Sequence, residues 1–236
     1  MRSYTLASRQ WRTTSSQFVA RRNDTLSVDL MRIGLDFDNT IVCYDDVFWK
    51  AAQERGLLGP DLCGSKRQLR DFVRSLPDGE VKWQALQGHV YGRGIEGAVL
   101  FSGVPEFLRR SQAHGDTILI VSHKSEHGHF DRDEINLRSA ALSWMETNEL
   151  LSGYGVCLRR EHVHFTSTRA EKLERIAELS CDVFIDDLEE ILLDPRFAYS
   201  VRRILLSKTA IEADGIPYSI CRDWLSISEL IFRDGS

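Results

Sequence analysis

The sequence lacks several features that mark particular classes of protein. No apolar run approaches the ~20 residues that a membrane-spanning helix needs. Positive charge is not in excess, because 30 Lys and Arg are set against 35 Asp and Glu, and the resulting net charge of −5 argues against a nucleic-acid-binding protein. Internal repeats are not apparent. At 236 residues and 42% hydrophobic content, the chain is long enough for one domain with a large core, or for a domain with an insertion.

Cysteine is scarce and scattered. The five cysteines are odd in number and show no CxxC spacing; they are Cys43, Cys63, Cys157, Cys181 and Cys221. This usage excludes a disulfide framework and a cysteine zinc site, and it favours reduced thiols. We therefore expect a cytoplasmic protein.

Residues 1–30 differ in composition from the rest, with five arginines, two acids and many Ser and Thr. Such composition occurs in organelle transit segments. The alternative is an N-terminal extension without structure, or a true start at Met31, and we favour this alternative because Met31 directly precedes the first clear strand. Either way, we expect no chemistry from residues 1–30.

Short apolar runs alternate with amphipathic segments along most of the chain. Strand-like runs lie at 31–37, 117–122, 163–165, 182–187 and 201–206, and we expect 201–206 to be the last strand of the core. One intervening helix opens with a capping box from Thr168 to Glu171. Strands that alternate with helices predict an α/β fold, with a parallel sheet covered by helices on both faces.

Residues 46–99 break this alternation. Three segments with helical spacing follow one another here, separated by turn residues such as Gly59-Pro60 and Pro77-Asp78-Gly79. We therefore expect a small, mostly helical insertion after the first strand.

Polar residues follow three of the predicted strands. They are Asp36 and Asp38, then Ser122 and His123, then Asp186 and Asp187. Because ligands bind beyond the carboxyl ends of parallel strands, these residues should converge on one crevice. Four carboxylates without Cys or His ligands favour a hard cation such as Mg²⁺. The Ser122 hydroxyl and the Lys172 ammonium, near a helix N-terminus, then complete a site for a phosphoryl group.

These residues resemble four ordered motifs of the haloacid dehalogenase superfamily. The matching segments are DFDNT at 36–40, ILIVSHK at 118–124, Lys172 in TRAEKLERI, and DVFIDD at 182–187. The resemblance covers about residues 31–206 and implies a Rossmann-like, three-layer core. It implies Asp36 as nucleophile, Asp38 as general acid and base, and Mg²⁺ held by the Asp36 carboxylate, the Asp38 backbone carbonyl and an acid of the Asp186/Asp187 pair, with Asp187 favoured. It also implies phosphate or substrate ligands, for which the candidates are Asn39, Thr40, Ser122, His123, Lys124 and Lys172.

In this family, a helical cap of the C1 type lies where the insertion lies here. The resemblance thus divides the chain into a core, residues 31–45 and 100–236, and a cap, residues 46–99, that selects the substrate. Dehalogenase members lack the second aspartate, so Asp38 favours a Mg²⁺-dependent phosphatase of a small phosphorylated metabolite. A sugar phosphate is the expected class, by similarity to hydrolases of bacterial polysaccharide pathways. A phosphomutase and a non-catalytic phospho-ligand-binding protein are the alternatives.

Several residues admit two interpretations from sequence. The histidines His123, His127, His129, His162 and His164 suggest a transition-metal site, but the absence of accompanying cysteines disfavours it. The aromatic residues Trp49, Trp83 and Tyr91 belong either to a core or to a substrate pocket. Asp45 and Asp46 either cap a helix or face the substrate, and the role of Glu190 stays open.

Overall fold

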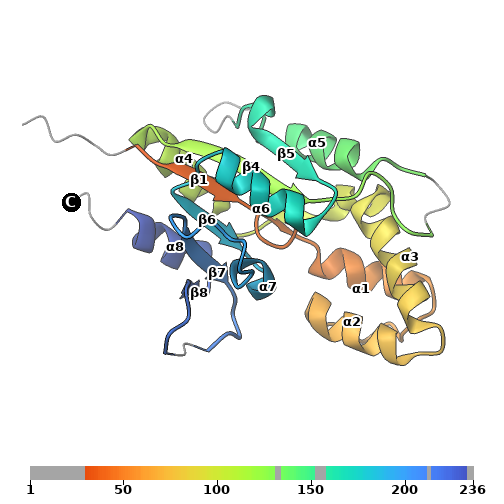
Figure 1. The fold of residues 1–236 in the computed structure, drawn as a ribbon. Coiled ribbons are helices and arrows are strands. Elements are labelled where there is room, and N and C mark those ends of the chain that lie inside the picture. The colour runs from red at the N-terminus through yellow and green to blue at the C-terminus, as the bar shows by residue number, and fades with distance from the viewer. Residues whose placement is uncertain (1–29, 131–133, 152–157, 212–213, 233–236) are drawn as a thin grey trace, which may run out of the picture.

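The computed structural model describes residues 30–130, 134–151, 158–211 and 214–232 (Figure 1). A six-stranded sheet forms its centre, with strand order β5-β4-β1-β6-β7-β8 and every pairing parallel. The strands are β1 (Arg32–Leu35), β4 (Thr117–His123), β5 (Val163–Thr166), β6 (Val183–Asp186), β7 (Arg202–Leu206) and β8 (Ser219–Cys221). The chain leaves β1 toward β4 on one side and later returns to β6 on the other, so the order reverses at β1. Ligand sites in parallel sheets lie at such a reversal.

Side chains alternate between two apolar layers, one on each face of the sheet. Ile33 and Leu35 of β1 enter the larger layer, which also buries α4 (Val104–His114), α5 (Leu137–Thr147) and α8 (Trp224–Ile231). Leu119 and Phe184 of the neighbouring strands enter the second layer, under α6 (Arg169–Glu178) and α7 (Glu189–Leu192). Since successive strand residues point to opposite faces, this alternation confirms the predicted three-layer α/β architecture.

Gly34 occupies the β1 position that faces the second layer. A Cβ atom there would lie 2.5 Å from Cδ2 of Phe184 and 2.9 Å from Sγ of Cys181. The missing side chain therefore lets the Phe184 ring lie across the central strand.

The helical insertion contains α1 (Asp45–Glu54), α2 (Lys66–Ser75), α3 (Gly79–Tyr91) and the 3₁₀ helix η1 (Arg93–Gly97). Two short strands that the sequence pattern did not indicate flank it, β2 (Val42–Cys43) and β3 (Val99–Leu100). They pair antiparallel, so the two ends of the insertion lie side by side. In Figure 1 the three helices stand beyond the ends of the strands.

The structure corrects two local predictions. The strand β7 is not the last, because β8 pairs with it as a further parallel edge strand. The capping box of α6 is only half formed: the Thr168 hydroxyl accepts from the Glu171 amide at 3.1 Å, but the Glu171 carboxylate accepts from the amide of Ser167, not from that of Thr168.

The predictions for residues 1–29 and for Cys157 lie outside the described residues. Within the described part of the chain, no helix has the length and apolar character needed to span a membrane.

Candidate active site

A cavity of about 720 Å³ opens at the carboxyl edge of the sheet, between the strands and the helical insertion. Its size falls in the range typical of small-molecule sites. We call the lining side chains of the sheet side the core wall: Asp36, Asp38, Ser122, Lys124, Lys172 and Asp187. We call those of α2 and α3 the insertion wall: Lys66, Arg70, Arg74, Trp83, Gln84, Gln87 and Tyr91. The predicted strand-end residues thus meet at one crevice, with Asp186 as the one member outside the lining.

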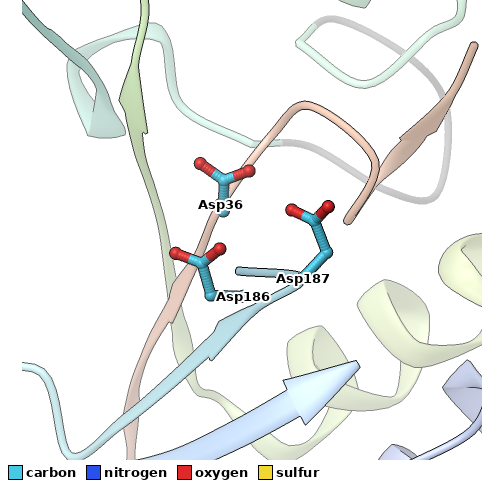
Figure 2. A group of neighbouring side chains, drawn as sticks. All are labelled: Asp36, Asp186 and Asp187. Atoms are coloured by element: carbon cyan, nitrogen blue, oxygen red, sulfur yellow. The ribbon is translucent and has the colours of Figure 1, made fainter. Parts of the chain in front are cut away.

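Three carboxylates gather at the ends of β1 and β6 (Figure 2). One oxygen each of Asp36, Asp186 and Asp187 lies within 4.8 Å of the others. Asp186 is fully buried beneath the cavity, whereas Asp187 is half-buried and lines it. This placement agrees with Asp187 as the acid of the pair that meets a ligand.

Lys172 joins two of these carboxylates. Its Nζ donates to Asp36 Oδ1 and to Asp186 Oδ2, each at 2.7 Å, and the side chain is fully buried. Burial alone would lower the pKa of Lys172, but the carboxylates of Asp186 and Asp36 raise it well above its ordinary value. The lysine is therefore a permanent cation that fixes both acids in place.

The negative charge of Asp186 and Asp187 is only partly compensated by Lys172. Burial raises the pKa of Asp186 to about 6, against an opposing effect of Lys172, and the charge of Asp36 adds to the rise. Burial and the charges of Asp186 and Asp36 raise the pKa of Asp187 well above its usual value. A cluster of acids with raised pKa values lowers its own repulsion when it binds a cation.

The donor chemistry fits a hard metal ion. All three groups are carboxylates, and among the described residues no histidine or cysteine joins a comparable cluster. Oxygen ligands of this kind suit Mg²⁺ better than Zn²⁺. The structure therefore gives no support to the histidine site that the sequence suggested as an alternative.

Asp38 lies in the turn that follows β1. Asn39 adopts a left-handed conformation with φ of 61°, which asparagine tolerates, and its amide donates to the carbonyl of Val42 at 2.8 Å. The Asp38 carboxylate accepts from Tyr44 Oη at 2.7 Å and from Lys124 Nζ at 2.8 Å. Burial and the Asp38 charge raise the pKa of Tyr44 well above its usual value, so the phenol stays a donor.

Ser122 and His123 end β4 beside these acids. The Ser122 hydroxyl is 1% exposed and has no hydrogen-bond partner among the described residues. Buried hydroxyls are rarely left unpaired, so a ligand in the cavity is the natural partner. His123 lies at the cavity surface, with Nε2 3.0 Å from the carbonyl oxygen of Ser167.

Thr40 is an exception among the predicted phosphate ligands. Its side chain is fully buried and does not line the cavity, and its carbonyl accepts from the Trp224 indole at 2.9 Å. Like that of Ser122, the Thr40 hydroxyl has no hydrogen-bond partner among the described residues, but it lies outside the cavity lining.

The insertion wall contains residues that the sequence did not single out. Lys66, Arg70 and Arg74 recur every four residues along α2, which is the spacing of one helix face. That spacing is the signal that could have found them. Trp83 and Tyr91 belong both to the core and to the pocket. They pack on Phe48 at ring-centroid distances of 5.1 and 5.6 Å, and they also line the cavity.

The structure also places Asp45, Asp46 and Glu190, whose roles the sequence left undecided. The Asp45 carboxylate accepts from the amide of Lys66 at 3.0 Å and so caps α2 rather than its own helix; neither Asp45 nor Asp46 lines the cavity. Glu190 pairs with Arg169 at the cavity rim.

No protein-family model matches the sequence, and a search of curated proteins finds no match. Solved structures do match. A haloacid dehalogenase-like hydrolase from Xanthomonas campestris is similar with TM-score 0.51 and 13% identity over 86% of this chain and 95% of that one. A HAD family hydrolase from Deinococcus radiodurans R1, solved with bound phosphate and sodium, is similar with TM-score 0.52 and 14% identity over 88% of this chain and 97% of that one. The chain has the fold of haloacid dehalogenase-like hydrolases.

Proposed function

We propose that the protein is a Mg²⁺-dependent phosphatase that hydrolyses a small phosphomonoester through an aspartyl-phosphate. The observation that carries the proposal is the meeting of Asp36, Asp187, Lys172 and the unpartnered Ser122 hydroxyl at one end of the sheet. These groups supply a nucleophile, a cation site and phosphate donors within one cavity. The bound phosphate of the Deinococcus neighbour of the same fold is consistent with this reading.

Asp36, Asp187 and the Asp38 backbone carbonyl would hold the metal ion. When bound, Mg²⁺ offsets the negative charge of the acids and of the incoming phosphate. Lys172 and Ser122, which line the same cavity, would bind phosphate oxygens. Because Lys172 also contacts Asp36 at 2.7 Å, it keeps the attacking carboxylate oriented toward phosphorus.

The reaction would proceed in two steps. In the first, a carboxylate oxygen of Asp36 forms a bond to phosphorus, the phosphorus–oxygen bond to the leaving group breaks, and Asp38 gives that oxygen a proton. In the second, Asp38 takes a proton from water as the water attacks phosphorus, which releases phosphate and restores Asp36. Tyr44 and Lys124 hold the Asp38 carboxyl in position for both proton transfers.

The Asp36→Asn substitution tests this function. It keeps the size of the side chain but removes the nucleophile, so phosphate release from a broad panel of phosphomonoesters with Mg²⁺ should fall by at least about 10⁴-fold. Asp46→Asn, at an exposed residue outside the cavity, should keep full activity. Circular dichroism would verify that both variants fold.

Retained turnover in Asp36→Asn would contradict the proposal. A phosphomutase would be indicated instead if the wild-type protein converted one sugar phosphate into an isomer without releasing free phosphate.

A further inference from the structure

The insertion wall differs from the core wall in the sign of its charge. Its titratable cations, Lys66, Arg70 and Arg74, all come from one face of α2, and no acidic residue of the insertion lines the cavity. Eight residues of helix place Lys66 and Arg74 about 12 Å apart along the axis. The stripe therefore extends well beyond the span of a single phosphate.

Lys66 is the inner end of this stripe, and it makes no ion pair within the described residues. Its Nζ donates to Tyr91 Oη at 2.6 Å and lies 5.3 Å from the ring centroids of both Phe48 and Tyr91. These contact partners are neutral. Burial acts to lower the pKa of Lys66, but Tyr91 and the more distant carboxylates of Asp187 and Asp38 raise it overall, so the ammonium is a cation that an anion entering the cavity can contact.

Arg70 and Arg74 continue the stripe outward. Their partners are exposed acids, Asp71 at 3.0 Å and Glu80 at 2.7 Å, and neither acid lines the cavity. Exposed pairs of this kind contribute little to stability. Either guanidinium can therefore exchange its partner for a ligand at small cost.

The two buried cations of the core wall are already committed. Lys172 binds Asp36 and Asp186, and Lys124 binds Asp38. A second anionic group on the substrate would find these two lysines occupied by buried or half-buried carboxylates, whereas the α2 cations have only neutral contacts or exposed acids as partners.

From this division we propose that Lys66, Arg70 and Arg74 form a second anion subsite. The substrate class would be a phosphomonoester that carries a further phosphate or carboxylate, bound by the insertion wall while the core wall holds the reacting phosphate. The inference rests on the proposed function and specifies its substrate.

The test compares substrates that differ only in the second anion. Suitable pairs are a hexose 1,6-bisphosphate with the hexose 6-phosphate, and 3-phosphoglycerate with glycerol 1-phosphate. The wild-type protein should prefer the doubly anionic member by about 10- to 100-fold in kcat/KM, the effect expected of a hydrogen bond to a charged group. Lys66→Met should bring the ratio close to 1, mainly by raising KM for the doubly anionic substrate.

Arg70→Gln and Arg74→Gln should each reduce the preference several-fold. Arg67→Gln is the matched control, because Arg67 lies on the same helix but is exposed and outside the cavity. It removes the same charge and should leave the ratio unchanged. The Arg70 and Arg74 variants, at a half-buried and an exposed position, also guard against a loss that comes only from misfolding of Lys66→Met.

Equal kcat/KM for both members of each pair, or a preference that survives all three substitutions, would overturn the subsite while leaving the phosphatase intact. If no phosphomonoester is turned over, the proposed function fails, and calorimetry on Asp36→Asn still decides the subsite. In that case, tighter binding of the bisphosphate that is lost with Lys66→Met supports it, and equal binding of the two hexose phosphates refutes it.

Discussion

The two walls of the cavity compensate their charges in opposite ways. On the core wall, Lys172 and Lys124 are buried and lie within 3 Å of carboxylates, of which Asp36 and Asp186 are buried and Asp38 is half-buried. On the insertion wall, the contacts of Lys66 with the part of the chain that the structure describes are a phenol and aromatic rings, and the nearest carboxylates act on it only at longer range. Buried and mutually paired charges fix a geometry, whereas a charge with neutral partners is ready for a ligand. The difference separates a wall suited to chemistry from a wall suited to recognition.

The strongest test of this difference is to replace one lysine of each wall by methionine and to compare the loss of stability. Lys172→Met leaves Asp36 and Asp186 buried without their cation, so we expect it to lower the free energy of unfolding by about 3–5 kcal/mol. Lys66→Met removes a cation from neutral partners and should cost less than about 1.5 kcal/mol. Urea denaturation in metal-free buffer at about pH 7.5 would measure both. Similar losses in the two variants would contradict the distinction between the walls.

A smaller effect is expected from Tyr44→Phe. This substitution removes one of the two donors that hold the Asp38 carboxylate, and we expect kcat to fall about 10-fold for singly and doubly anionic substrates alike. Tyr218→Phe is a matched control, because its phenol also donates to a carboxylate, that of Glu189, outside the cavity. If Tyr44→Phe changed the substrate preference rather than kcat, Tyr44 would contribute to substrate recognition instead.

The effect of Mg²⁺ on Tm at two pH values tests whether the carboxylates of the core wall bind the metal ion. Asp186 has a pKa of about 6, raised from 3.8, so in the metal-free protein its contribution to stability is present below pH 3.8 and is lost as the pH rises through about 6. At about pH 5 a cation must displace the proton of Asp186, whereas at about pH 7.5 Asp186 is ionised and no longer competes in this way. Mg²⁺ should therefore raise Tm by a few degrees at the higher pH and by less at the lower.

Asp187→Asn should abolish most of this shift in Tm, whereas Asp71→Asn, at an exposed acid on α2, should not. An equal Mg²⁺ effect at the two pH values would argue against the carboxylate cluster as the binding site.

The core wall could be predicted from sequence because its signals are local. Each acid or hydroxyl directly follows an apolar strand, and parallel strands bring such ends to one edge. The complete burial of Thr40 could not be predicted from sequence, because it depends on the conformation of the turn at Asn39. The strand β8 escaped prediction because three residues carry too little periodicity. The spacing of Lys66, Arg70 and Arg74 indicates one face of a helix, but that this face turns toward the cavity depends on the packing of α2 and α3 against α1, which the spacing alone does not reveal.

The short hairpin of β2 and β3 has a consequence for how readily the helical insertion can be exchanged. Val42 pairs with Leu100 and Cys43 with Val99, so the chain leaves and re-enters the sheet region at neighbouring points. A segment with adjacent ends can be lengthened, shortened or replaced without moving the strands that carry Asp36 and Ser122. The same geometry makes 45–97 a natural unit for grafting, because a different set of helices joined at Val42 and Leu100 would leave the end of β1 and Asp36 in place.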